Sequence, residues 1–370
     1  MVAKNPFLGR WDTAEGRDAR WAAVLWLMHG GDRPAGFGTT DEGRLDLRGL
    51  VVPEPVELAD IVVTSAAPGN TMTFTQTSGR LKIAGQEWMD VDLSYSWLPS
   101  LGVENSRWVN CRLDAAVLRD SRIWDTDVQD CSFVSADLRG APIGTATLAA
   151  RDTWWRKVSF RNAFMGAGGF FSGWRAEDVS FEGAKISDLG FDQVTLVRVV
   201  FDGKLRKVHL NNRVMDLSPA PGPLVDCDFS RCEFDDVGFE NVHLTNVAFP
   251  PGTVVVGNAV PVARLALSLL PDSDDEFTAF GRKLLSGDLR VPGSDELGAN
   301  VHTRRDLDEG DPADPFAQAY LGSLEEAAVR LGTPILHDGG VFVGPPAPVP
   351  GAEADSGKRR GGFWSRRDRG

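Results

Sequence analysis

Residues 91–148 read VDLSY SWLPS LGVEN SRWVN CRLDA AVLRD SRIWD TDVQD CSFVS ADLRG APIGT ATL when written in blocks of five. A large apolar residue occupies the third place of every block, from Leu93 to Leu148, and a mostly small residue stands two places before it. This period fits neither the turn of an α-helix nor the two-residue alternation of a strand. The stretch therefore predicts a chain that turns a corner every five residues and stacks coil upon coil.

Blocks such as CRLDA (111–115), CSFVS (131–135) and ADLRG (136–140) closely resemble the pentapeptide-repeat proteins, whose repeat has the loose form A(D/N)LXX. The resemblance implies an all-β solenoid, a right-handed quadrilateral β-helix with one pentapeptide per face and four per coil. The pattern makes physical sense, because the bulky residue fills the interior and the small residue fits beside it. Coils stacked about 4.8 Å apart then share one continuous core.

The same spacing predicts which side chains form that core. It resumes in shorter runs beyond residue 148, after changes of register, and it makes Phe170 one of the centres. The predicted structural repeat centres include Leu93, Leu98, Trp108, Leu113, Leu118, Ile123, Phe133, Leu138, Phe181, Phe191, Phe201, Phe229, Phe234, Phe239 and Phe249.

The rest of the chain differs in pattern from the repeats. Residues 17–29 have helical spacing, with Asp12 or Thr13 as the candidate N-cap, and alternation around residues 72–75 suggests longer strands. Further helix patterns cover residues 262–270, 274–285 and 316–331. We therefore expect four segments: 1–43, an N-terminal helical cap; 44–250, the β-helix with inserted loops; 251–338, an acidic, partly helical C-terminal region; and 339–370, a disordered Pro/Gly-rich linker and basic tail.

Charge is spread unevenly along a chain whose formal net charge is −13. Residues 251–357 hold seventeen acidic and seven basic residues, whereas residues 358–370 hold six basic residues and one acidic residue. No apolar stretch is long enough to span a membrane, and the first residues lack the apolar region of a signal peptide. These features predict a cytoplasmic protein.

The residues that carry chemistry are few and scattered. The five His residues form no catalytic or metal-ligating pattern, so we expect no enzyme activity, no cofactor and no metal. All four Cys residues stand in the small-residue place. Cys111 and Cys131 lie one coil apart, close enough for a disulfide by distance, but the reduced and purely structural interpretation is favoured.

Aromatic residues outside the five-residue register are the candidate partner contacts. Trp154, Trp155, Phe171 and Trp174 lie in two segments that interrupt the repeat, and loops on a rigid scaffold often carry binding residues. Phe363 and Trp364 stand among the arginines of the tail. These six side chains are therefore candidates for exposed contacts with a partner.

Three functions remain open. The first is a non-enzymatic protein-binding scaffold. The second follows from the resemblance, since some members of the family mimic duplex DNA and protect DNA gyrase, a type II topoisomerase, from poisons. The third is association of the basic tail with nucleic acid or a membrane surface, direct nucleic-acid binding elsewhere being disfavoured by the acidic charge. A homodimer is a further possibility that the sequence leaves undecided.

Overall fold

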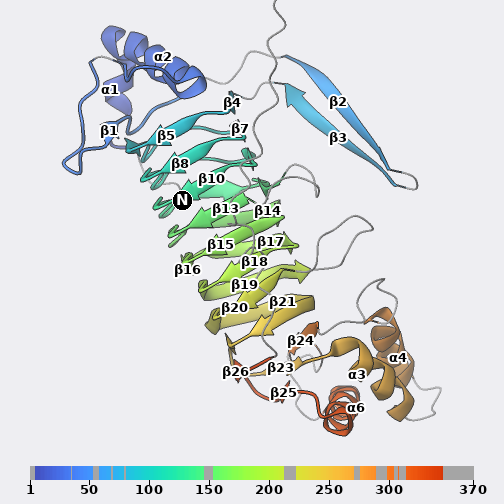
Figure 1. Cartoon of the computed structure of the whole chain (residues 1–370). Coiled ribbons are helices and arrows are strands. Elements are labelled where there is room, and N and C mark those ends of the chain that lie inside the picture. The colour runs from blue at the N-terminus through green and yellow to red at the C-terminus, as the bar shows by residue number, and fades with distance from the viewer. Residues whose placement is uncertain are drawn as a thin grey trace, which may run out of the picture.

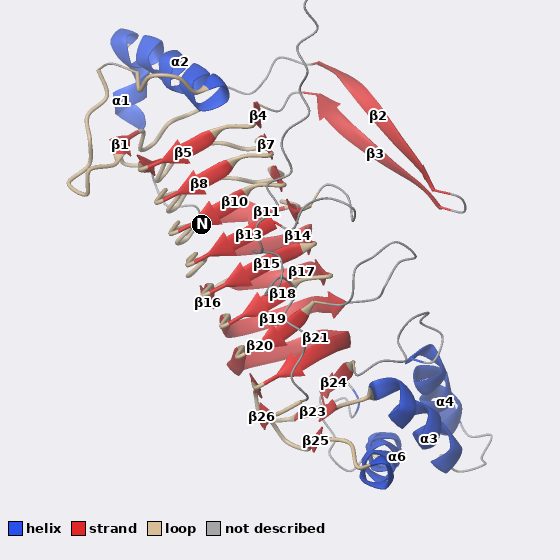
Figure 2. Cartoon of the chain, viewed as in Figure 1, coloured by secondary structure: helices blue, strands red, loops and turns tan. Residues whose placement is uncertain are grey.

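The computed structural model describes residues 5–34, 36–52, 58–67, 70–78, 81–145, 153–211, 222–270, 276–288, 298–303, 307 and 314–344. Short parallel strands stack into a long rod between residues 45 and 249, with helices at each end (Figure 1). Figure 2 shows that the strands form the rod and that the helices lie only at its ends. None of the described helices is long and apolar enough to cross a membrane.

Backbone pairing shows that each full coil contains four faces. Trp88 pairs with Trp108 and Trp108 with Val128, so the chain returns to the same column after twenty residues. Bridged positions within one coil follow each other at five-residue steps, as at Asp92, Trp97, Gly102 and Arg107. The rod is therefore a β-helix, and we number its faces 1 to 4 by the columns that contain Val103, Trp108, Leu113 and Leu118.

The strands follow these columns. Face 1 contains β4 (Lys82–Ala84), β7 (Gly102–Glu104), β9 (Arg122–Trp124) and β12 (Ile143–Gly144). Face 2 contains β5 (Glu87–Met89), β8 (Arg107–Val109), β10 (Asp127–Gln129), β13 (Thr153–Arg156), β15 (Trp174–Glu177), β18 (Thr195–Val197) and β20 (Pro223–Val225). Face 3 contains β1 (Leu45–Asp46), β6 (Val91–Asp92), β16 (Ser180–Glu182) and β22 (Val247–Phe249), and face 4 contains β11 (Asp137–Arg139). Longer strands bend around corners and serve several faces: β14 (Phe164–Ser172), β17 (Lys185–Asp192), β19 (Val200–Asn211) and β21 (Asp228–Thr245).

Left-handed backbone turns make the corners. The residue two places after a repeat centre has a positive φ in most repeats, for example 52° at Asn110 and 55° at Asp120. Asn and Asp tolerate this conformation better than most residues with a Cβ. Many polar residues of the repeats are therefore explained by the backbone turn alone.

The core is one continuous stack of the predicted centres. All fifteen are buried, and on face 3 the rings of Phe133, Phe160, Phe181, Phe201, Phe229 and Phe249 stack with successive centroids 4.5–5.9 Å apart. Each coil supplies one ring, so neighbouring coils bury each other's apolar surface. The predicted core is confirmed at these positions.

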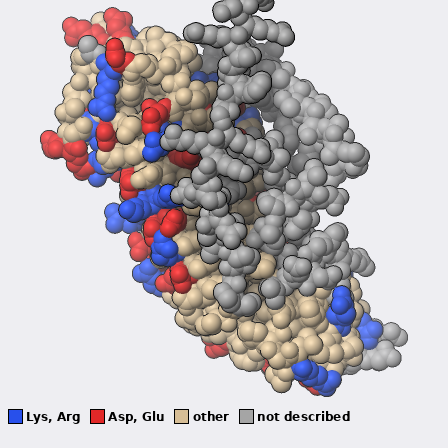
Figure 3. Space-filling view, viewed as in Figure 1, with Lys and Arg blue, Asp and Glu red and all other residues tan. Residues whose placement is uncertain are grey.

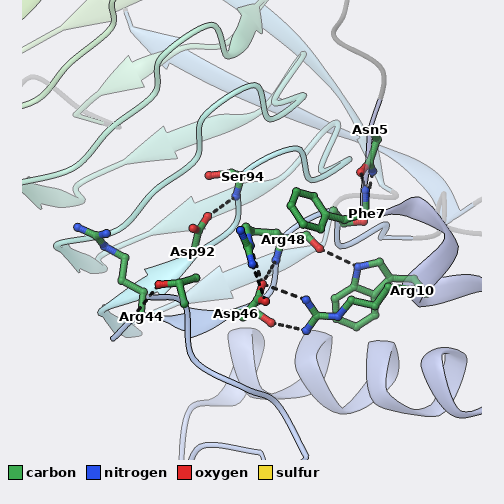
Figure 4. A network of polar contacts seen from close by, with 11 residues as sticks. Asn5, Phe7, Arg10, Arg44, Asp46, Arg48, Asp92 and Ser94 are labelled. Atoms are coloured by element: carbon green, nitrogen blue, oxygen red, sulfur yellow. Dashed lines mark hydrogen bonds and ion pairs between the residues drawn. The ribbon is translucent and has the colours of Figure 1, made fainter. Parts of the chain in front are cut away.

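The N-terminal helices α1 (Leu8–Asp12) and α2 (Ala14–His29) pack against the first coils. Thr13 caps α2 by accepting a hydrogen bond from the Gly16 N–H, as one of the two predicted caps. Asp46 bonds to the guanidinium groups of Arg10 and Arg48, which joins α1 to the coil (Figure 4). Burial raises the pKa of Asp46, but these hydrogen bonds outweigh it and lower the pKa to about 2.

At the other end, antiparallel strands follow the last coil. They are β23 (Thr253–Val256), β24 (Ala299–Thr303), β25 (Ile335–Leu336) and β26 (Gly340–Phe342), and β24 and β26 pair with β21 and β22. The helices α3 (Ala259–Leu269), α4 (Glu276–Asp288) and α6 (Pro315–Leu331) form a second apolar cluster beside them. All three lie where the sequence predicts helices. A hairpin of β2 (Leu58–Ala67) and β3 (Asn70–Ser78) interrupts the first coil and agrees with the strand pattern.

Cys111→Arg should abolish cooperative folding of the rod. Cys111 is 1% exposed, and its N–H lies 3.3 Å from Sγ of Cys131 in the next coil, so an arginine there would place an unpaired charge in the core. Thermal melting followed by circular dichroism is the measurement, with Val109→Arg as the outward-facing control in the same coil. A Cys111→Arg melting curve that matches the control would contradict the inward orientation.

Asp46→Asn should flatten the loss of stability in acid. A carboxyl whose pKa is lowered by folding contributes stability above its unfolded pKa of about 3.9, and that contribution disappears as the pH falls towards 2. We expect the wild type to lose on the order of 2 kcal/mol more than the variant over this range. Urea denaturation at pH 5 and pH 2.5 measures the difference. Glu87→Gln, which removes an exposed carboxyl paired with Arg107, is the control and should follow the wild type.

Candidate functional site: the face bordered by chain insertions

Wherever two successive repeat centres lie more than five residues apart, the extra residues stand at a corner of face 1. We call such a place a lengthening of the repeat. The centres of this face are paired in sequence from Ile83 through Val103, Ile123, Ile143, Phe171, Phe191 and Leu210 to Phe239. Two lengthenings lie where face 4 leads into face 1: the segment between Val52 and Ile83, which contains β2 and β3, and one extra residue between Met165 and Phe171. The other two lie where face 1 leads into face 2, between Ile143 and Trp155 and between Leu210 and Leu224.

The outward surface of face 1 combines small residues with a few larger and charged ones. In the lower coils one outward row contains Phe170, Gly190, His209 and Gly238, and the other contains Ser172, Asp192, Asn211 and Glu240. Gly144 is required by geometry, since its φ is 129° and a Cβ there would lie 1.9 Å from the carbonyl oxygen of Ser172. At Gly190 and Gly238, which are partly exposed, the backbone of this face carries no outward side chain.

Charged groups on face 1 are few and each has a defined environment. Lys82 and Glu104 form an ion pair of 3.1 Å between the first two coils. The guanidinium carbon of Arg122 lies 4.3 Å from the ring centroid of Trp124, and burial lowers the pKa of Arg122. Burial also raises the pKa of Asp192, against the opposing effect of His209.

Trp154 stands at the corner between faces 1 and 2, held by two arginines. The guanidinium carbons of Arg156 and Arg175 each lie 4.2 Å from its ring centroid, and its backbone N–H donates to Asp127. Such cation–π contacts contribute about 0.5–1 kcal/mol each at partly exposed sites. Trp154 is thus a fixed, partly exposed aromatic side chain, as a contact residue requires.

The prediction of exposure was wrong for three other aromatic residues. Trp155, Phe171 and Trp174 are fully buried, so none can contact a partner in the folded protein. Phe363 and Trp364 lie outside the described residues. The prediction failed because the insertions move the register. Trp155 takes the face 2 position that follows Val128, and Leu148, which the period predicts there, lies outside the described residues.

A shift of register explains the burial of Phe171, and an exchange of large and small side chains explains that of Trp174. The extra residue between Met165 and Phe171 makes Phe171, and not the predicted Phe170, the centre on face 1. Trp174 occupies the usual small-residue place, and the centre two residues later is the small Ala176. The bulky and the small side chain have exchanged places, so the interior volume is kept. In the sequence, the small Ala176 at a centre position was the signal that could have predicted a buried Trp174 two residues earlier.

The four cysteines are free and buried, as the favoured sequence interpretation requires. Burial raises the pKa of Cys227 and of Cys232 to about 12, and raises that of Cys111 well above its ordinary value. Thiols protonated in this way are poor nucleophiles and poor metal ligands. No group of three or more metal-ligating side chains occurs among the described residues.

Acidic and basic side chains lie intermingled over the upper part of the rod on the face seen in Figure 3. Arg198, for example, binds both Glu177 and Asp178, and Arg231 lies near Glu182 and Asp202. Several Asp residues, such as Asp120, Asp130 and Asp226, occupy the left-handed corners described above. Within the described part of the chain, the carboxylates therefore serve corners and ion pairs between coils and do not form an unbroken acidic face.

Comparison with known proteins gives distant likenesses only. No family model matches the chain, and no curated protein sequence matches it. Among solved structures, full-length QnrB1, a plasmid-mediated fluoroquinolone resistance protein, is 15% identical over 43% of this chain and 84% of its own, with a TM-score of 0.25. The pentapeptide repeat protein Rfr23 from the cyanobacterium Cyanothece 51142 is 18% identical over 30% of this chain and 67% of its own, with a TM-score of 0.18. These values assign neither a family nor an activity.

The neighbouring residues Trp154 and Trp155 should respond very differently to substitution. Trp155→Ala should destabilise the protein by about 3–5 kcal/mol, because it empties a fully buried site. Trp154→Ala should cost about 1–2 kcal/mol through its two cation–π contacts. Urea denaturation followed by circular dichroism measures both. Equal losses would show that the burial described for the two residues is incorrect.

Proposed function

We propose that the chain is a non-enzymatic protein-binding scaffold of the pentapeptide-repeat type, and that face 1 of its right-handed, four-sided β-helix receives the partner. The observation that carries this proposal is the placement of all four lengthenings of the repeat at the two corners of face 1. Insertions in solenoids map to loops on one side, which is often the side that binds.

The rigidity of the rod supports the same function. The interior is one continuous apolar cluster, so the outward residues of successive coils keep fixed spacings. A preorganised surface loses little conformational entropy when a partner binds. In this proposal residues 1–43 and 251–338 cap the two ends of the β-helix of residues 44–250. The prediction of disorder from residue 339 was wrong at its start, because β26 (Gly340–Phe342) pairs with β22 of the last coil.

The surface of face 1 favours a protein partner over a polyanion. Its described small residues allow close approach to the backbone, and partly exposed Trp154 lies beside them at the corner. Aromatic side chains of this kind are enriched where proteins bind each other. Ionic attraction contributes little here, because the few charges of the face include both signs.

Gyrase protection by DNA mimicry has less support. Mimicry needs continuous rows of carboxylates, whereas those of the described rod alternate with arginines and lysines. A type II topoisomerase as the partner stays a prediction. So does an association through the basic tail, which lies outside the described residues.

Gly190→Arg should abolish partner binding without unfolding the protein. Gly190 lies in the middle of face 1, its φ is not in the left-handed region, and a Cβ there would make only ordinary contacts of 3.7 Å and longer. The long side chain should therefore project outward and obstruct the face. Quantitative pull-down from extract of the source organism, with mass spectrometry, measures which proteins are lost. Purified gyrase from the same organism, tested for relief from a cleavage-stabilising drug, tests the topoisomerase alternative directly.

Ser230→Arg is the matched control, because Ser230 is exposed on face 3 and the variant adds the same charge. We expect the control to retain the partner and both variants to melt close to the wild type. A partner that is lost equally from both variants, or retained by both, would refute face 1 as the binding surface.

A further inference from the structure

We propose that face 4 carries a second binding surface, which receives a short acidic segment of a partner protein. The surface covers the outward residues of the four coils centred on Leu138, Met165, Ile186 and Leu205, which are paired in sequence. This basic surface lies on a protein whose formal net charge is −13. Nothing in the core or the corners requires lysine and arginine at these outward positions.

Two arginines mark the ends of one row on this surface. Arg139, Gly166, Ser187 and Arg206 occupy the same position in consecutive coils. Coils stack about 4.8 Å apart, so the two arginines stand about 14 Å apart. The two residues between them are small, and Gly166 must remain so, because a Cβ there would lie 1.6 Å from the carbonyl oxygen of Ser187. No large side chain therefore separates the two guanidinium groups within this row.

Further cations lie on both sides of that row. Lys185 is exposed, with Nζ 4.9 Å from the ring centroid of Phe164, and Arg139 approaches the same ring at 5.9 Å. Lys207 is exposed at the corner beyond Arg206. The side chains of Arg139 and Arg206 are 44% and 61% exposed, so all four cations are accessible to a ligand.

The carboxylates at the face 4 positions of these four coils do not neutralise the exposed cations. Asp137 is 3% exposed in its side chain and is enclosed by Arg119 and Arg139, at 2.5 and 2.7 Å. Burial raises the pKa of Asp137, but its hydrogen bonds to Arg139 and Arg119 lower it overall, so the group is ionised and occupied at neutral pH. The other carboxylate, Asp188, stands at a corner. The surface therefore has more accessible positive than negative charge.

The size of the surface indicates the partner. In the next coil Glu233 and Asp235 bind Lys204, and Asp235 also lies 3.9 Å from Nε of Arg206, so carboxylates bound the basic surface at that end. A span of about 14 Å accommodates about four residues of extended peptide. A longer polyanion such as single-stranded nucleic acid would extend over these carboxylates and be repelled by them. A short acidic peptide segment fits both the span and the charge.

The inference is independent of the function proposed for face 1, because the two surfaces use different columns of the rod. The test uses fluorescence anisotropy with a labelled peptide of about six glutamates at low salt, and a glutamine peptide of equal length as the neutral probe. We expect the protein to bind the glutamate peptide only, and binding to weaken as salt is raised. Gly190→Arg should leave this binding unchanged, whatever the outcome for face 1.

The double variant Lys185→Gln/Arg206→Gln should weaken binding of the glutamate peptide by about fivefold or more, as expected for the loss of two exposed ionic contacts. Arg107→Gln/Arg198→Gln removes the same charge from face 2 and from its corner with face 3, and should change binding less than twofold, a difference of about 0.4 kcal/mol. Ser187→Glu, which places a carboxylate between the two arginines, should abolish binding. Circular dichroism and melting temperature should be unchanged in all variants.

Three results would overturn the proposal. The first is equal weakening by both double variants, which would show a general effect of net charge. The second is tighter binding of an oligothymidine of similar length with the same dependence on Lys185 and Arg206, which would make nucleic acid the partner. The third is no binding of the glutamate peptide by the wild-type protein at low salt.

Discussion

The structure depends on one constraint, which is that each coil must fill the interior of its neighbours while its backbone pairs with them. A coil of twenty residues gives each face one bulky inward residue, and the ladder of phenylalanine rings on face 3 shows the result. No single coil could bury its own apolar side chains, so stability comes from the stacking. The hydrogen bonds between coils fix the same register and keep the inward residues aligned.

This constraint also determines where the sequence is free to vary. An added residue inside a face would turn the next bulky side chain away from the core, so additions are accommodated at corners. The structure shows additions at two of the four corners, and both border face 1. Corners between other faces carry no added residues from Leu93 to Phe249, where the single shortening lies between Phe201 and Leu205. The uneven placement is what distinguishes face 1 from its neighbours.

The stacking of the coils also determines which charged side chains on the surface can pair. Outward residues of adjacent coils lie about 4.8 Å apart, so a carboxylate in one coil is within reach of an arginine in the next. Arg198 with Asp178, and Arg107 with Glu87, are pairs of this kind. Such pairs offset part of the acidity of the rod locally, and among the described residues the middle of face 4 presents an excess of exposed cations. The charge counted along the sequence could not show this excess of cations, because it does not tell on which face of the rod a residue lies.

Local periodicity and residue size are enough to predict the repeat, the inward centres, the small-residue positions and the helices near both ends. Phe133, Phe181 and Cys111 were correctly placed for that reason. The sequence could not show how the two interruptions at residues 149–157 and 166–174 shift the register, so Trp155, Phe171 and Trp174 were taken for surface residues. Only the tertiary structure decided their burial, since the room for each depends on what the coils above and below contribute. Faces 1 and 4 likewise exist only after folding, because their residues are about twenty positions apart in the chain and meet through backbone pairing between coils.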